Sequence, residues 1–247
     1  MEIKTYKKDC EYSYTLGAFP TFELIDAMPE NIITVFSGSG FTDIDKLENK
    51  CREKGINFSV NDKMINKLSD KGNVYTAGVF RKYEQELDCN KPHVVLVNPS
   101  DMGNLGTIIR TAAGFGITDL AVIEPAADIF NPKTVRASMG SIFRIRTRRF
   151  DSFENYLKYL EKNQNAGNGK REIFTFMLNG EKPLTVNDCP KPQVYSLVFG
   201  NEASGLPDEF LSYGTSIIIP QSSLVDSLNL TIAAGIGMYM FSSQKNA

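Results

Sequence analysis

The fold is decided by residues 94–112, which read Val94-Val95-Leu96-Val97-Asn98-Pro99-Ser100-Asp101-Met102-Gly103-Asn104-Leu105-Gly106-Thr107-Ile108-Ile109-Arg110-Thr111-Ala112. The first four residues form a continuous apolar run, typical of a strand that is buried on both faces of a parallel sheet. Asn104 is a natural helix N-cap, and apolar side chains follow it at helical spacing as far as Phe115. This stretch therefore predicts a strand, a loop and a helix.

Strand-like and helix-like segments continue to alternate towards the C-terminus. Further strands are predicted at residues 120–123, 142–147, 173–177, 195–199 and 216–219, and a long last helix from about Ser227 to Ser243. Such alternation predicts a mostly parallel sheet covered by helices on both faces. The expected fold class is α/β.

The first part of the chain is a smaller α/β module. Short strands and helices alternate as far as Phe80, and a first helix is predicted after Thr21 as its cap. The polar residues 84–92 have little to bury and indicate a linker. We expect two domains, at residues 1–88 and 92–247.

The composition predicts a globular protein whose chemistry needs no metal. Of 247 residues, 42% are hydrophobic and 23% charged, as is usual for globular domains. The only histidine, His93, cannot build a zinc site alone, and the four cysteines match no metal-ligand spacing. We find no signal-peptide core and no apolar run of about 18 residues, so we expect a cytoplasmic protein without a membrane span.

The charge distribution leaves two interpretations open. A net charge of −2 argues mildly against a nucleic-acid partner, because phosphate binders are usually basic. However, Arg144, Arg146 and Arg148 alternate along a predicted strand and would share one face, and Arg149 follows them. That face is either an RNA-binding surface or a solvated strand face. Two smaller basic clusters are Lys7-Lys8 and Arg81-Lys82.

Arg110 is a candidate site residue. It lies one to two turns into the predicted helix and away from the apolar stripe of that helix. Proteins of the α/β class bind ligands at the carboxyl ends of central strands. The alternative is an arginine that only faces solvent.

Two later segments also follow predicted strands. In Phe199-Gly200-Asn201-Glu202, the glycine would let a ligand approach the backbone closely, although an ordinary strand-to-helix connection explains it as well. Ile219-Pro220 is followed by Ser227-Leu228-Asn229, where the free N–H groups of a helix start suit an oxygen-rich ligand. Capping by Asp226 or Ser227 is the alternative there. No Gly-x-Gly-x-x-Gly fingerprint occurs, which disfavours other α/β enzymes with a nucleotide cofactor.

Together these segments resemble, in order and spacing, the three motifs of the SpoU (TrmH) RNA 2′-O-ribose methyltransferases, a branch of the SPOUT superfamily. The resemblance covers about residues 92–244, and residues 136–141 resemble the stretch between motifs one and two. The first 90 residues resemble, much more weakly, the small substrate-binding module that many members carry.

The resemblance implies a SPOUT-type catalytic domain with a C-terminal trefoil knot, a feature that general rules of chain topology would exclude. It further implies a homodimer with the active site near the subunit interface, and S-adenosylmethionine bound inside the knot. The implied reaction transfers a methyl group to a ribose 2′-hydroxyl of structured RNA. Ribosomal RNA is favoured over tRNA because of the N-terminal module.

Site residues are carried over by motif position. The implied catalytic set is Asn104, Arg110, Glu202, Ser227 and Asn229, and the implied cofactor-binding set is Phe199, Gly200, Asn201, Ile219 and Leu228. Glu202, Ser227 and Asn229 are expected to hold Arg110 and the ribose in place. Ala203 and Ser222-Ser223 stand where many members have glycine. A non-catalytic RNA-binding protein on the same scaffold is the alternative, which the intact catalytic set disfavours.

Overall fold

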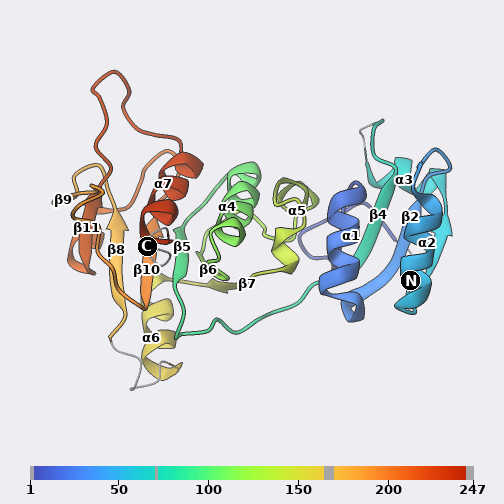
Figure 1. Ribbon diagram of the computed structural model, residues 1–247, viewed down its shortest axis with the longest axis horizontal. Helices are drawn as coiled ribbons and strands as arrows, with labels where there is room; N and C mark the ends of the chain where they lie inside the picture. Colours follow the sequence, from blue (N-terminus) through green and yellow to red (C-terminus); the bar gives the residue numbers. More distant parts are fainter. Residues whose placement is uncertain (1–2, 70–71, 164–169, 243–247) are drawn as a thin grey trace. The chain divides into compact units, whose positions relative to one another are not determined.

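The computed structural model describes residues 3–69, 72–163 and 170–242 (Figure 1). Its packing defines two compact units: unit 1 is Met1–Tyr83 with Asp128–Arg144, and unit 2 is Glu84–Ala127 with Ile145–Ala247. Residues 128–144 belong to unit 1 because Phe80 packs edge-on against Phe143, with ring centroids 5.1 Å apart, and Ser13 donates to the Phe130 carbonyl. The functional boundary predicted at residues 88–92 stays a prediction.

Unit 1 is built on a four-stranded sheet of order β1-β4-β2-β3. The strands are β1 (Tyr12–Tyr14), β2 (Ile32–Ser37), β3 (Phe58–Val60) and β4 (Thr76–Arg81). The helices are α1 (Ala18–Ala27), α2 (Ile44–Glu53), α3 (Asp62–Leu68) and α5 (Pro132–Ala137), with short 3-10 helices at Pro29–Asn31 and Ser141–Phe143.

Helix α1 begins earlier than the sequence predicts. Gly17, not Thr21, is its N-cap residue, so Pro20 lies in the first turn, where its missing N–H costs nothing. The Thr21 hydroxyl instead donates to the main-chain oxygen of Gly17 at 2.8 Å.

Unit 2 is built on a seven-stranded sheet of order β7-β6-β5-β10-β8-β11-β9, in which every neighbouring pair is parallel. The strands are β5 (His93–Val97), β6 (Asp119–Ile123), β7 (Arg146–Phe150), β8 (Glu172–Phe176), β9 (Lys182–Pro183), β10 (Tyr195–Phe199) and β11 (Thr215–Ile218). The helices are α4 (Met102–Gly114), α6 (Phe153–Asn163) and α7 (Leu230–Ser242), with a 3-10 helix at Asp208–Ser212. The predicted α/β class with a mostly parallel sheet is confirmed.

Both faces of this sheet are covered. Alternate strand residues such as Val95, Ala121 and Val198 pack with Phe153 and Tyr156 of α6 in one buried cluster. Helix α7 packs against α4 and β10, and both helices lie along the sheet in Figure 1. The central strands are fully buried, as their apolar sequences predict. The trefoil knot stays a prediction.

Two elements begin later than predicted. Strand β7 starts at Arg146 rather than at residue 142, because Gly140 is left-handed (φ 80°) and residues 141–143 form a 3-10 turn. Helix α7 starts at Leu230 rather than Ser227, because the Asn229 side chain accepts from the Thr231 N–H at 2.8 Å and caps the helix there. Ser243, the predicted end of this helix, lies outside the described residues.

Candidate functional site

The topology of unit 2 brings two loops together. Strand β5 lies between β6 and β10, so the chain leaves β5 towards one side of the sheet while β10 lies on the other. Residues that follow β5 and β10 therefore meet at the carboxyl edge of the sheet, at a topological switch point.

A pocket of about 290 Å³ opens beside this point. Its size is near the lower end for small-molecule sites, which run from about 300 to 1,000 Å³. Segments that follow β8, β10 and β11 and the start of α7 line it: Phe176–Asn179, Phe199–Leu206, Ile217, Ile219, Gln221, Ser227, Leu228, Leu230 and Ala233.

The pocket collects most of the predicted site residues. All five of the implied cofactor-binding residues line it, together with Glu202 and Ser227 of the implied catalytic set. Its apolar wall includes Phe176 and Phe199, whose rings stack with centroids 4.4 Å apart. The second and third motif segments thus meet in one cavity, while the role of each residue stays a prediction.

Gly200 serves the chain's own backbone at this point. A Cβ at Gly200 would lie 2.1 Å from the carbonyl carbon of Gly205. This close approach lets Asn201 and Gly205 exchange two main-chain hydrogen bonds, of 3.1 and 3.0 Å. The structure therefore supplies a second reason for a glycine at position 200, namely the packing of its own turn. The sequence suggested the close approach of a ligand.

Glu202 joins the two loops. Its Oε2 accepts from the Ser100 N–H at 2.9 Å and the Ser100 hydroxyl at 2.7 Å. Its Oε1 accepts from the Asp101 N–H at 3.1 Å and the Asn104 side-chain amide at 3.2 Å. Asn201 Nδ2 lies 3.4 Å from Oε2. This carboxylate is thus the polar centre of the site.

These bonds set the ionisation of Glu202. Partial burial on its own would raise the pKa of the carboxyl, but the Ser100 and Asp101 donors outweigh it and lower the pKa to about 2. Glu202 is therefore a carboxylate throughout the neutral range.

Helix α4 begins differently from the prediction. Asp101, not Asn104, is the N-cap: its carboxylate accepts from the Asn104 N–H at 2.7 Å. Since Asn104 is inside the first turn, its side chain is free to reach Glu202.

Arg110 and Asn229 do not line the pocket. Arg110 is exposed on α4, and within the described ranges no side chain pairs with its guanidinium. The expected contact between Glu202 and Arg110 is therefore not present in the structure of the single chain. The Asn229 side chain caps α7. Capping by Asp226 or Ser227, the alternative from the sequence, gave Asn229 no role, whereas the structure makes it the capping residue.

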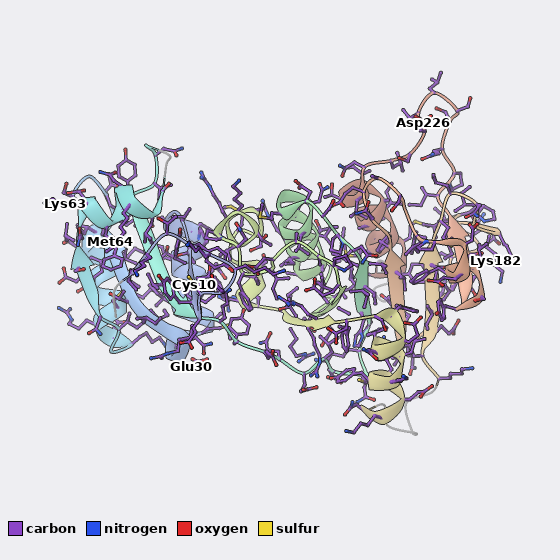
Figure 2. The ribbon with its side chains drawn as sticks, turned by 180° about the vertical axis from the view of Figure 1, so that it is seen from behind. Cys10, Glu30, Lys63, Met64, Lys182 and Asp226 are labelled. Carbon is purple, nitrogen blue, oxygen red and sulfur yellow. The ribbon has the colours of Figure 1, made fainter. Side chains whose placement is uncertain are left out.

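The loop between β11 and α7 forms one side of the pocket. Gln221 and Ser227 line the cavity, and the Gln221 side chain donates to the Asp226 carbonyl at 3.2 Å. Figure 2 shows Asp226 at the outer end of this loop. Leu224 lies here too and is 90% exposed.

The arginines of residues 144–149 are not a free RNA-binding face. Arg146 donates two hydrogen bonds of 2.6 Å to the buried Asp119 carboxylate. Arg149 forms an ion pair with Glu124 at 2.8 Å. Arg148 forms an ion pair with Glu86. Arg144 pairs with Glu23 within unit 1. Ion pairing, which neither interpretation of the sequence included, accounts for these arginines.

The two smaller basic clusters lie together in unit 1. Arg81 is the register partner of Tyr12, and the Lys82 ammonium donates to the Lys8 carbonyl at 2.9 Å. Lys7, Lys8 and Arg81 are exposed and make no ion pair in the part of unit 1 that the structure describes.

Sequence reasoning missed Ser100, Asp101 and the wall segment Phe176–Asn179. An acidic residue three positions before Asn104 is an N-cap signal that would have revealed Asp101. The wall segment overlaps the end of the strand predicted at residues 173–177 and lies at the same edge of the sheet, as the parallel topology requires. Nothing in the sequence pairs Ser100 with Glu202.

The described residues contain neither a metal-ligand cluster nor a membrane-spanning helix. They hold no group of three His, Cys, Asp or Glu side chains arranged as metal ligands. None of their helices has the length and apolar character that a membrane crossing requires.

The known proteins that this chain resembles are named as RNA methyltransferases. The chain is 30% identical over 166 residues, 66% of its length and 62% of the other's, to a 23S rRNA (guanosine(2553)-2'-O)-methyltransferase of Bacillus subtilis (strain 168). It is 31% identical over 150 residues, 60% of its length and 84% of the other's, to a putative tRNA (cytidine(34)-2'-O)-methyltransferase of Listeria innocua. A crystal structure of an AdoMet-bound rRNA methyltransferase from Sinorhizobium meliloti is similar with a TM-score of 0.77 and 26% identity, covering 96% of this chain and 88% of that one.

The chain spans 62%, 51% and 26% of the first three curated relatives that it matches, less than two thirds of each. Its residues 91–239 match the SpoU rRNA Methylase family. This range is more than half of the chain and holds every residue that lines the pocket. The chain therefore belongs to the SpoU rRNA Methylase family.

Proposed function

We propose that the chain is an S-adenosylmethionine-dependent methyltransferase that acts on a ribose 2′-hydroxyl of structured RNA. The observation that carries this proposal is the convergence of the second and third motif segments on one pocket, with Asn104 of the first bound to Glu202. The Sinorhizobium protein, whose fold this chain shares over 96% of its length, is described as AdoMet-bound.

The pocket fits a cofactor with an aromatic ring and polar groups. Phe199 and Leu228 offer apolar contact, and the turn at Gly200 and Asn201 offers main-chain groups beside it. Ile219 also lines the pocket. S-adenosylmethionine, when bound, supplies a methyl group that its sulfonium already activates.

We assign to Arg110 the role of contacting the ribose 2′-oxygen. Guanidinium groups stay protonated, so this role is to stabilise negative charge that develops on the oxygen and to fix its geometry, not to abstract a proton. Ser227 lines the pocket and Asn229 caps the helix beside it, so we assign both to orienting the reactants.

Ribosomal RNA is the substrate class that we favour. The Sinorhizobium rRNA methyltransferase matches this chain over both units. By contrast, the putative tRNA enzyme of Listeria matches over 60% of this chain and is itself 84% covered by that match, which leaves little length for a module like unit 1.

We assign RNA backbone contact to Lys7, Lys8 and Arg81 of unit 1, because these cations are exposed and no carboxylate among the described residues pairs with them. Contacts with phosphate make affinity fall steeply with salt. The triple substitution of Lys7, Lys8 and Arg81 by Ala should weaken RNA binding and flatten its salt dependence. The triple substitution of Lys46 in α2, Lys54 in the turn after α2 and Lys63 in α3 by Ala is a charge-matched control, and equal loss of RNA binding in both variants would refute this assignment.

We also propose a homodimer. Phe115, the C-cap residue of α4, and Ile232 and Tyr239 of α7 are 36%, 54% and 56% exposed, and the ring centroids of Phe115 and Tyr239 lie 6.0 Å apart. A second copy of the chain is the partner that we assign to this face, which adjoins the helix that carries Arg110. A cytoplasmic location belongs to the same proposal, since the four cysteines form no disulfide.

Transfer of labelled methyl to total rRNA and to total tRNA, assayed separately, tests the function and its substrate class together. Label in rRNA is the expected result, and label in tRNA alone would overturn the choice of substrate. No label in either pool, with the cofactor bound, would favour the non-catalytic RNA-binding alternative.

A further inference from the structure

Ser100 stands apart among the residues around Glu202, because it gives the carboxylate two donors. Its N–H and its hydroxyl both bind Oε2, at 2.9 and 2.7 Å. None of the three motifs predicted from the sequence assigns a role to this residue.

The hydrogen-bond donors around Glu202 occupy all the acceptor positions of its two carboxylate oxygens. A carboxylate offers about four lone-pair positions. The Ser100, Asp101, Asn104 and Asn201 donors already meet its two oxygens at 2.7 to 3.4 Å. No acceptor position is left for a substrate hydroxyl or for Arg110, so Glu202 acts through its neighbours.

Among the donors to Glu202, Asn104 has a side-chain oxygen that, in the described part of the chain, is free to accept a further hydrogen bond. Because an ionised carboxylate only accepts hydrogen bonds, the Asn104 amide must turn its Nδ2 towards Glu202 Oε1. The amide oxygen then faces away from Glu202, and no donor within the described residues meets it. The first turn of α4 thus presents an oriented, available acceptor.

We propose that Ser100 is a positioning residue for methyl transfer: it fixes the Glu202 carboxylate, which orients Asn104 so that its amide oxygen accepts a hydrogen bond from the RNA ribose hydroxyl. This inference rests on the proposed function. Ser100 does not touch the reactants, and the chain of contacts runs from Ser100 through Glu202 to Asn104.

Ser100→Ala in the full chain tests the proposal. It removes one hydrogen bond to a charged group, so kcat should fall about tenfold. The Kd for S-adenosylmethionine should change less than about twofold, since Ser100 does not line the pocket. Ser100→Thr keeps the hydroxyl and should restore kcat. An unchanged kcat in Ser100→Ala, or a loss that Ser100→Thr does not restore, would overturn the proposal.

Ser212→Ala is the matched control. The Ser212 hydroxyl also makes one short bond, to the Glu209 carbonyl at 2.7 Å, but lies outside the pocket. Its kcat should equal that of the wild type. A purely structural role for Ser100 would lower kcat only in proportion to the folded fraction, which thermal unfolding of both variants measures.

A second readout does not depend on activity. In NMR spectra of the full chain, the side-chain amide signal of Asn104, assigned by its loss in Asn104→Asp, should shift in Ser100→Ala and not in Ser212→Ala. A signal that stays in place would refute the positioning role. If the wild type transferred no methyl group while the signal shifted, the proposed function would fail and the contact chain would stand.

Discussion

The side-chain amide of Asn201 donates to the main-chain oxygen of Asn98 at 2.8 Å, which fastens the loop after β10 to the end of β5. Asn98 itself has a positive φ of 53°, and the side-chain oxygen Oδ1 of Asn201 accepts from the Ala203 N–H at 2.9 Å. One side chain thereby shapes its own turn and ties it to the neighbouring strand. The pocket is built on this junction, so its geometry depends on backbone packing as much as on reactive groups.

Gly200→Ala should disrupt the pocket. A methyl group there would meet the Gly205 carbonyl carbon at 2.1 Å, and the turn would have to open. We expect the affinity for S-adenosylmethionine, measured by calorimetry, to fall by at least about tenfold. In Gly114→Ala, by contrast, the new Cβ has no neighbour within 4 Å, and affinity should be unchanged. Equal affinities in the two variants would contradict this account of the turn.

Asp119→Ala should destabilise the fold strongly. The carboxylate is fully buried and holds the Arg146 guanidinium through two bonds, and its loss leaves that partly buried charge with only the distant Asp88 carboxylate, at 3.9 Å, as an ionic partner among the described residues. The cost in unfolding free energy is about 3 kcal/mol, measured by urea denaturation. Arg149→Ala removes a more exposed pair with Glu124 and should cost less than about 1 kcal/mol. The reverse order would show that the Asp119 pair does not stabilise the sheet edge.

Glu202 makes the stability of the fold depend on pH in the acid range. Because folding lowers the pKa of this carboxyl from 4.5 to about 2, its contribution is complete above about pH 4.5 and is lost as the pH falls towards 2. The difference in urea midpoint between the wild type and Glu202→Gln should therefore shrink as the pH is lowered across this window. A difference in urea midpoint that stays constant from pH 5 to pH 2 would mean that hydrogen bonds to the ionised Glu202 carboxylate do not stabilise the fold.

The face of α4 and α7 should control assembly. Tyr239→Glu places a charge on this exposed apolar face, and burying it in a subunit contact would be costly. We expect sedimentation to show a dimer for the wild type and a monomer for Tyr239→Glu. Val186→Glu is the control, because Val186 is 77% exposed and belongs to neither helix. A monomeric wild type, or dimers in both variants, would exclude this face as the contact.

The sequence predicted the fold class well because its strongest signals are local. Continuous apolar runs such as 94–97 mark buried parallel strands without knowledge of their partners. The starts of helices were predicted wrongly, because one side-chain hydrogen bond decides them. Asp101 caps α4, where Asn104 was expected, and Asn229 caps α7, where Asp226 or Ser227 was expected.

Long-range pairing explains the rest of what the sequence did not predict. The arginines at 146, 148 and 149 meet carboxylates on other strands and segments, so their alternation indicated a face but not its partners. Ser100 and Glu202 are likewise joined only by the strand order that sets β5 beside β10.

The most direct test of the central claim is to identify the product nucleoside. RNA treated with the chain and S-adenosylmethionine carrying a deuterated methyl group would be digested to nucleosides and analysed by mass spectrometry. We predict a nucleoside that carries the heavy methyl group on its ribose, and its loss in Arg110→Ala, a variant that should still bind the cofactor. A heavy methyl group on a base, or an undiminished yield from Arg110→Ala, would contradict the account.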